Sequence, residues 1–236
     1  TCHALRAALE EGDTSELERA GTLWNVNFSQ PNECDPVFEA WLANNLLSPE
    51  IAWQRFTKLI QARQQNLARY VSRLMPEREQ QLAEIYLRID AQPERVQNDA
   101  ALLREEPEIA EIIIHGIRRL ATVDAQRAQA SLQRYQDLHN FDAQQWLSAR
   151  QFVTQRLQLQ GFVADAEALL IEDENLRSES LVGWILRDAL SQQDWQRMEA
   201  WLNRLPAEAA QSERWSYWRA RTYEQLNSPV LAEPIY

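Results

Sequence analysis

The sequence contains two cysteines and three histidines, the residues that most often bind structural or catalytic zinc. Such a site needs further thiols or imidazoles at suitable spacing. Cys2 and Cys34 do not lie in a Cys-x-x-Cys pair, and His3, His115 and His139 are scattered along the chain. The sequence therefore predicts no metal site and no cofactor.

The two cysteines allow two interpretations: reduced thiols in a cytosolic protein, or a disulfide that closes a loop of about 30 residues. Asp35 and Pro36 suit the N-cap and first position of a helix, so they would hold the preceding Cys34 in one orientation. This context favours a Cys2–Cys34 disulfide. Such a bond would add about 3–4 kcal/mol to the stability and would place the protein outside the cytosol.

Three acidic clusters contain the carboxylates that could act as general acids or bases. They are LEEGD (9–13), REEPE (104–108) and IEDEN (171–175). A glycosidase needs two carboxyl groups at a controlled separation, or one whose pKa is raised in a cleft. We interpret the clusters as structural, because they fall at expected helix ends and turns.

The segment RSES (177–180) places Glu179 between two serines, which resembles a catalytic glutamate motif. It precedes the apolar run LVGWIL, so Ser178 is better interpreted as the N-cap of a helix over Leu181 to Leu190. No nucleophile elbow, phosphate-binding loop or dinucleotide-binding glycine pattern is found in the sequence. The sequence predicts no catalytic residue in this chain.

The segment ERWSYWRA (213–220) combines aromatic residues on one expected helical face with arginines beside them. Surfaces of this composition can bind sugars or partner peptides. The nine tryptophans of the chain recur at helical spacing, which is more typical of packing between helices than of ligand binding. We expect this segment to pack against a neighbouring pair of helices.

Helical periodicity dominates the sequence that must position these residues. Trp195, Met198, Leu202 and Leu205, for example, recur at intervals that place them on one helical face. Only 5 of 236 residues are glycine, and no convincing alternation of apolar and polar residues indicates a strand. Short polar breaks separate the helices, so an all-α chain of antiparallel helix pairs is predicted.

The helix pairs of the last third form a degenerate repeat. Phe162, Trp195 and Val230 take aligned positions 33 and 35 residues apart, close to the length of a tetratricopeptide-like unit. Each pair would bury its apolar face on the next. We therefore predict a right-handed superhelix, an α-α solenoid of tetratricopeptide-like pairs, that forms a single domain over residues 1–236.

The chain is acidic, with 24 Lys and Arg against 35 Asp and Glu, a net charge of 24 − 35 = −11. This balance disfavours nucleic acid as a partner, and no apolar run is long enough to predict a transmembrane segment. The sequence starts without Met and both ends fall inside expected helices, so we expect it to be part of a longer protein.

Two segments resemble the soluble lytic murein transglycosylases, specifically the large periplasmic type. SQPNECDPVFEAWL (29–42) is similar to a Ser-Gln-Pro-Asn-x-Cys-Asp run of that family that is followed by an apolar helix with Trp. WLNRLPAEAAQSERWSYWRARTYEQL (201–226) is similar to a Trp-Leu-x-x-Leu-Pro stretch followed by a Trp-x-Tyr-Trp-x-Ala helix. The two matches occur in the family's order.

The resemblance implies a U-shaped superhelical domain with a disulfide at Cys2 and Cys34, and a location in the periplasm. Family members cleave the β-1,4 bond between N-acetylmuramic acid and N-acetylglucosamine in peptidoglycan and leave 1,6-anhydromuramic products. They use one glutamate and no metal, in a C-terminal domain that resembles goose lysozyme. This chain contains no segment that matches that domain, so no catalytic residue is carried over, and Glu179 does not match the catalytic position.

The resemblance thus predicts a non-catalytic scaffold region of an enzyme of cell wall turnover. Its partners would be peptidoglycan glycan strands, reached through the parent enzyme, and cell-wall proteins. A tetratricopeptide-like scaffold for protein–protein interaction, unrelated to an enzyme, is the alternative that the repeat pattern leaves open.

Overall fold

The computed structural model describes residues 2–235, except for the side chains of Pro229 and Pro234. Every regular element of these residues is an α-helix or a short 3-10 helix, and no strand occurs among them. The chain divides into two compact units, residues 1–92 and 93–236.

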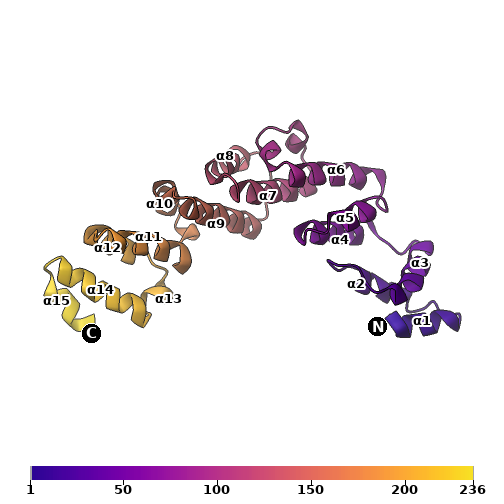
Figure 1. Cartoon of the computed structure of the whole chain (residues 1–236), viewed down its shortest axis with the longest axis horizontal. Coiled ribbons are helices and arrows are strands. Elements are labelled where there is room, and N and C mark those ends of the chain that lie inside the picture. The colour runs from indigo at the N-terminus through magenta and orange to yellow at the C-terminus, as the bar shows by residue number, and fades with distance from the viewer. Residues whose placement is uncertain (1, 236) are drawn as a thin grey trace. The chain divides into compact units, whose positions relative to one another are not determined.

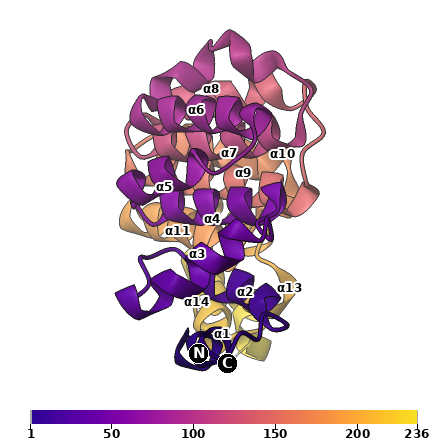
Figure 2. The same ribbon diagram turned by 90° about the vertical axis from the view of Figure 1, so that its right-hand side faces the viewer.

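Unit 1 begins with short helices and ends with longer ones. Its elements are α1 (Cys2–Glu10), η1 (Leu17–Arg19), α2 (Ala20–Trp24), η2 (Asn32–Cys34), α3 (Asp35–Ala43), α4 (Pro49–Gln61), α5 (Gln65–Ser72) and α6 (Glu77–Ala91). The helix α1 packs against η2 and α3, while α4 packs against both α5 and α6. Figure 2 shows α4 and α5 lying next to each other.

Unit 2 is a regular series of helix pairs (Figure 1). It contains η3 (Pro93–Gln97), η4 (Ala100–Leu103), α7 (Pro107–Ala121), α8 (Ala125–Tyr135), α9 (Ala143–Leu159), α10 (Val163–Glu172), η5 (Glu174–Leu176), α11 (Glu179–Ser191), α12 (Trp195–Leu202), α13 (Ala207–Ala210), α14 (Glu213–Gln225), α15 (Pro229–Ala232) and η6 (Glu233–Ile235). The helix α9 packs against both α7 and α11. The helices α8, α10 and α12 pack against α7, α9 and α11, respectively. This contact between neighbouring pairs is the arrangement expected of a helix-pair array.

A continuous apolar core runs through the later pairs of unit 2. Its buried members come from α10 to α14: Leu170, Leu176, Leu181, Val182, Ile185, Leu186, Ala189, Met198, Trp201, Leu202, Leu205, Ala209 and Trp215. They follow the helical spacing predicted from the sequence. Because each pair leaves one apolar face open, burial of that face requires the next pair.

Three turns between paired helices of unit 2 share one backbone geometry, although they share no residue type. In unit 2, Gly161, Gln193 and Asn227 have φ values of 87°, 57° and 56°. In each turn the next residue's N–H donates to the carbonyl five residues earlier, with N–O distances of 2.8, 2.9 and 2.9 Å. This hydrogen bond and a left-handed residue define a Schellman C-cap, which ends one helix and reverses the chain.

Unit 1 ends helices in the same way. The left-handed residues are Gly12, Asn45 and Arg63, and each is followed by the same long-range backbone hydrogen bond. Only two of the six such positions in the described residues carry glycine. The low glycine content therefore does not exclude tight turns here, because Asn, Arg and Gln adopt the left-handed conformation at a cost.

The repeat register differs by one and two residues from the predicted alignment. The equivalent positions are the residues that follow each left-handed residue, namely Phe162, Asp194 and Ser228, at spacings of 32 and 34. The sequence alignment matched Trp195 and Val230 with Phe162 because it compared apolar residues. The turn geometry depends on backbone conformation, which the side chains at these positions do not reveal. The predicted all-α fold of helix pairs is confirmed.

Candidate functional site

The two cysteines lie on different elements at the start of unit 1. The structure joins Cys2, at the start of α1, to Cys34, at the end of η2, by a disulfide with a Cα–Cα distance of 5.1 Å. The Cys34 side chain is buried. The bond closes a loop over a sequence separation of 32 residues, so it ties α1 to the beginning of α3.

The cap of α3 differs from the predicted one. The N-cap position belongs to Cys34, which has helical backbone angles, and Asp35 is already the first helical residue with no side-chain capping hydrogen bond. The 3-10 turn η2 runs directly into α3, so no extended residue precedes the helix to serve as a side-chain cap. Asp35 still places a negative charge in the first turn, where the helix dipole favours it.

The remaining residues of the SQPNECDPVFEAW segment hold the preceding helix. The Gln30 side chain donates a 2.6 Å hydrogen bond to the Leu23 carbonyl of α2. The ring centres of Trp41 on α3 and Trp24 on α2 lie 5.5 Å apart. If Gly21 carried a Cβ, that atom would lie only 3.1 Å from Cζ2 of Trp41. Glycine at this position therefore permits the close approach of α2 and α3, and the segment acts structurally.

Arg55 of α4 is a buried cation, only 4% exposed, that has no carboxylate partner among the described residues. Its guanidinium carbon lies 4.3 Å from the centre of the Trp24 ring, and its Nη2 donates to the Phe28 carbonyl at 3.4 Å. Burial lowers the pKa of Arg55 to about 10, so the group stays charged at neutral pH. It connects α4 to the loop before η2.

The first acidic cluster makes local contacts at the end of α1. The Arg6 and Glu10 side chains form an exposed ion pair at 3.0 Å. Asp13 accepts a 2.8 Å hydrogen bond from the Ser15 backbone N–H, and hydrogen bonds to Ser15 lower the pKa of Asp13. A lowered pKa keeps this carboxyl ionised, which is the opposite of what a general acid requires.

The other two acidic clusters also lie at helix ends, as predicted. Glu106 precedes α7 and pairs with Arg104. Asp173 precedes η5 and binds the Arg150 side chain of α9. Burial would raise the pKa of Asp173, but hydrogen bonds from the Asn175 backbone and from Arg150 outweigh that effect and hold the pKa below its usual value.

The RSES segment begins α11. The Ser178 hydroxyl accepts a hydrogen bond from the Leu181 N–H at 3.3 Å, which confirms the predicted N-cap. The Glu179 carboxylate accepts a 2.9 Å hydrogen bond from the indole Nε1 of Trp215. Glu179 therefore connects α11 to α14. A Cβ at Gly183 would lie 3.2 Å from the same indole, so glycine there permits this contact.

A polar cluster joins α10, α11 and α12. The Arg197 guanidinium donates to both carboxylate oxygens of Glu167, at 3.1 and 2.7 Å, and to Asp188 at 2.7 Å. The Trp201 indole also donates to Glu167. Hydrogen bonds to Glu167 are the main cause of the raised pKa of Arg197, which burial alone would lower.

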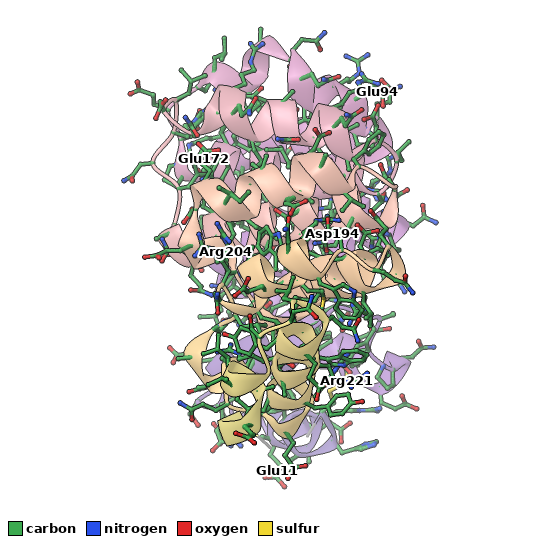
Figure 3. All side chains as sticks on the ribbon, turned by 90° about the vertical axis from the view of Figure 1, so that its left-hand side faces the viewer. Glu11, Glu94, Glu172, Asp194, Arg204 and Arg221 are labelled. Atoms are coloured by element: carbon green, nitrogen blue, oxygen red, sulfur yellow. A yellow bond between two sulfur atoms is a disulfide. The ribbon has the colours of Figure 1, made fainter. Side chains whose placement is uncertain are left out.

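Sequence reasoning missed this cluster. The only available signal is spacing, because Glu167 precedes Arg197 and Trp201 by 30 and 34 residues, close to one repeat. The helix α12, which carries Arg197 and Trp201, can be located in Figure 3 from two labelled residues. Asp194 comes just before this helix in the sequence, and Arg204 comes shortly after it. The cluster occupies a boundary between pairs and gives the array a directional polar contact.

The aromatic residues of ERWSYWRA do not share one face. Trp215 is buried in the core and Trp218 packs against that core, whereas Tyr217 is half exposed. Successive helical residues are 100° apart, so Tyr217 points well away from Trp215. The prediction of packing holds for the two tryptophans, and the prediction of a single aromatic face was wrong.

The histidines and cysteines form no metal-binding group. No cluster of three or more His, Cys, Asp or Glu residues suited to a metal ion is found in residues 2–235. His139 contacts the Leu102 carbonyl at 2.8 Å, and His115 lies within α7. Among the same residues, no helix has the length and apolar character needed to cross a bilayer.

The sequence is similar to that of known soluble lytic murein transglycosylases. No family model matches the chain. It is 27% identical over 222 residues to the soluble lytic murein transglycosylase of Salmonella typhimurium, and equally to that of Escherichia coli K12. These matches cover 93% of this chain, which spans only about a third, 34%, of the relatives' length.

Two solved structures of lytic transglycosylases have a similar fold. The 70-kDa soluble lytic transglycosylase in complex with bulgecin A aligns over 99% of this chain with a TM-score of 0.80 and 24% identity. An inactive mutant of the lytic transglycosylase Slt from Pseudomonas aeruginosa aligns over 99% with a TM-score of 0.74 and 26% identity. This chain covers 38% of each solved chain.

Fold and contacts together define an all-α protein of the helix-pair solenoid class. Within that class, similarity over nearly its whole length relates the chain to the soluble lytic murein transglycosylases, and the resemblance predicted from the two motifs is confirmed. The disulfide and the polar contacts at the helix boundaries thus lie in a helical chain that is similar to part of these enzymes.

Proposed function

We propose that this chain is a non-catalytic helical scaffold of a soluble lytic transglycosylase. The parent enzyme would cleave the β-1,4 bond between N-acetylmuramic acid and N-acetylglucosamine of peptidoglycan in the periplasm and leave 1,6-anhydromuramic products. Catalysis would belong to a separate domain that resembles goose lysozyme. The observation that carries the proposal is similarity across 93% of this chain to relatives of which it covers only 34%.

The contacts of the acidic residues support a structural role for this chain. The Glu179 carboxylate accepts a hydrogen bond from the Trp215 indole. Asp173 and Glu167 form ion pairs with Arg150 and Arg197, respectively. A lytic glutamate must give up and take back a proton beside a sugar, which requires a carboxyl that is free to face substrate. These carboxylates are instead used to connect helices.

A single domain over residues 1–236 is part of the same proposal. It predicts that the two compact units unfold together in denaturant, with coincident transitions by tryptophan fluorescence and far-ultraviolet circular dichroism. Two separate transitions would show that the units are independent domains.

An assay of peptidoglycan cleavage tests the proposal that this chain alone is not catalytic. Purified chain incubated with peptidoglycan sacculi should release no 1,6-anhydromuropeptides detectable by mass spectrometry, whereas a complete lytic transglycosylase should release them under the same conditions. Robust release by this chain would overturn the proposal. The coding sequence after Tyr236 provides a second test, because a goose-lysozyme-like segment with a Glu-Ser motif is expected there.

Compartment is tested through the cysteines. Cells are lysed in an alkylating reagent, and the peptides that contain Cys2 and Cys34 are analysed without reduction. A disulfide-linked peptide recovered from the periplasmic fraction is the expected result. Two alkylated thiols in the cytosolic fraction would favour the alternative, a tetratricopeptide-like scaffold for protein–protein interaction.

A further inference from the structure

The helices α7 and α9 carry two arginines on one aromatic ring. The guanidinium carbon of Arg118 lies 5.0 Å from the centre of the Phe152 ring, and that of Arg156 lies 4.8 Å from the same centre. All three side chains are partly exposed. Phe152 thus contacts two positive charges, at positions set by the packing of α7 on α9.

Neither guanidinium is neutralised by a carboxylate within residues 2–235. The Nε–H of Arg156 is also buried and donates no hydrogen bond among these residues. By contrast, Arg150 on the same helix pairs with Asp173. Like Arg55 of unit 1, both arginines thus lack a carboxylate partner among the described residues of a chain whose net charge is −11.

The helix α11 carries a similar contact with a single arginine. Trp184 on α11 follows Phe152 by 32 residues, the same spacing as that between the turns at Gly161 and Gln193. The guanidinium carbon of Arg187 lies 6.0 Å from the Trp184 ring, and Arg187 also has no acidic partner among the described residues. The helices α9 and α11 pack on each other, and Gln158 donates a 2.9 Å hydrogen bond to the Leu181 carbonyl.

We propose that Arg118 and Arg156, held by Phe152, form a binding site for carboxylate groups of the peptide stems of peptidoglycan, and that Arg187 extends it. A guanidinium binds a carboxylate through two parallel hydrogen bonds, and groups already positioned by an aromatic ring lose little freedom on binding. The identity of the ligand rests on the proposed function. A peptidoglycan strand carries the carboxylates of its peptide stems at intervals along its length. Such a ligand suits Arg156 and Arg187, which lie on successive helices of the array.

The test uses the purified chain and soluble, uncrosslinked peptidoglycan strands that retain their peptide stems. Binding is measured by isothermal titration calorimetry at fixed ionic strength. Replacing both arginines, with Arg118→Gln and Arg156→Gln, should weaken binding by about tenfold or more. Removing the stems from the strands with an amidase should weaken binding by the wild-type chain to a similar degree.

Arg134→Gln is the matched control, because Arg134 is an exposed arginine that lies 5.7 Å from the Tyr135 ring on α8. It removes the same charge and should leave the affinity unchanged. The pair Arg118→Lys and Arg156→Lys keeps the charge but loses the paired hydrogen bonds, so it should also bind more weakly. If the glutamine variant does not fold, as judged by circular dichroism, the lysine variant still tests whether the two guanidiniums bind the carboxylates.

Four outcomes would overturn the site: equal binding by the substituted and wild-type chains, equal binding of strands without stems, no binding by the wild-type chain, or binding of poly-L-glutamate as tight as that of the strands. The last outcome would indicate a general site for acidic polymers, including acidic proteins. None of these results bears on the lytic assay, so failure of the site and failure of the scaffold proposal can be distinguished.

Discussion

The beginning of unit 1 and the later pairs of unit 2 hold successive helices together by different means. In unit 1 a covalent bond joins α1 to the start of α3, and the buried Arg55 relies on a ring and a carbonyl. In unit 2 the Arg197 guanidinium joins three helices through two carboxylates. Indole N–H groups add further links between neighbouring pairs.

Helix length explains the difference. The helices α1, α2 and α3 contain 9, 5 and 9 residues, whereas α9 and α11 contain 17 and 13 and are paired with α10 and α12, of 10 and 8 residues. Short helices bury little apolar surface and are only marginally stable alone, so the first part of unit 1 depends on a cross-link. The longer pairs of unit 2 share a core and need only directional polar contacts to set their orientation.

Removing the disulfide should have the largest effect. Cys2→Ser with Cys34→Ser is expected to lower the free energy of unfolding by about 3–4 kcal/mol, because a loop of about 30 residues is no longer closed in the unfolded state. Hydrogen–deuterium exchange followed by mass spectrometry should show faster exchange in residues 2–43.

Unit 2 provides the internal control for that experiment. Exchange in residues 143–225 should change much less than exchange near the cysteines. Equal acceleration in both regions would contradict the view that the cross-link serves the short helices of unit 1.

Substituting the carboxylate that binds Arg197 should have the next largest effect. Glu167→Gln is expected to cost about 2 kcal/mol, because charged hydrogen bonds to the guanidinium are lost and Arg197 keeps only Asp188. Urea denaturation followed by tryptophan fluorescence measures the loss. Glu172→Gln is the matched control on the same helix, since Glu172 is exposed, and should change stability by less than about 0.5 kcal/mol.

Glycine at a left-handed turn should be stabilising in either unit. Gln193→Gly is expected to raise the free energy of unfolding by about 1 kcal/mol, because a residue with a Cβ is strained at φ 57°. Asn45→Gly tests the same geometry in unit 1, with a smaller expected gain because Asn tolerates the left-handed conformation better than Gln. Thermal denaturation measures both changes.

The neighbouring Gln192 has an ordinary negative φ of −92° and provides the control. Gln192→Gly should be neutral or slightly destabilising. If Gln192→Gly stabilises as much as Gln193→Gly, the left-handed conformation is not the cause.

Acidification should have the smallest effect of this series. The pKa of Asp173 is lower in the folded chain than in the unfolded one, so its contacts stabilise the protein above the unfolded pKa of about 4 and this contribution disappears as the pH falls through the folded pKa. The contribution should be less than about 1 kcal/mol, because the ion pair with Arg150 is partly solvated.

Urea denaturation between pH 5 and pH 2.5 measures this effect. Asp173→Asn should reduce the dependence of stability on pH in that range, and Glu172→Gln should leave it closer to that of the wild-type chain. A steeper dependence in Asp173→Asn would contradict the direction assigned to the pKa.

Much of the fold could be predicted because its signals are local. Helical spacing of apolar residues predicted the helix α12 at Trp195 to Leu202. The capping preference of serine predicted that another helix, α11, begins after Ser178. The cap at Asp35 was wrong because a 3-10 turn precedes α3. That turn forms through backbone hydrogen bonding, which residue type specifies weakly.

The candidate contacts were harder to predict. Glu179 could be assigned to a helix start, but its bond to Trp215 spans 36 residues and depends on how two pairs pack. The arginines on Phe152 come from two helices, and no motif links them. Contacts of this kind require the relative placement of helices, whereas periodicity reports only which face of each helix is apolar.

The sequence by itself determined the all-α class, the succession of helix pairs and the family resemblance, because all three depend on patterns along the chain. Only the tertiary structure decided which residues meet across pairs. The Arg197 cluster, the turns at Gln193 and Asn227 and the unpaired arginines at Phe152 all depend on it. The physical reason is that side chains about one repeat apart come together only after each pair has buried its apolar face on the next.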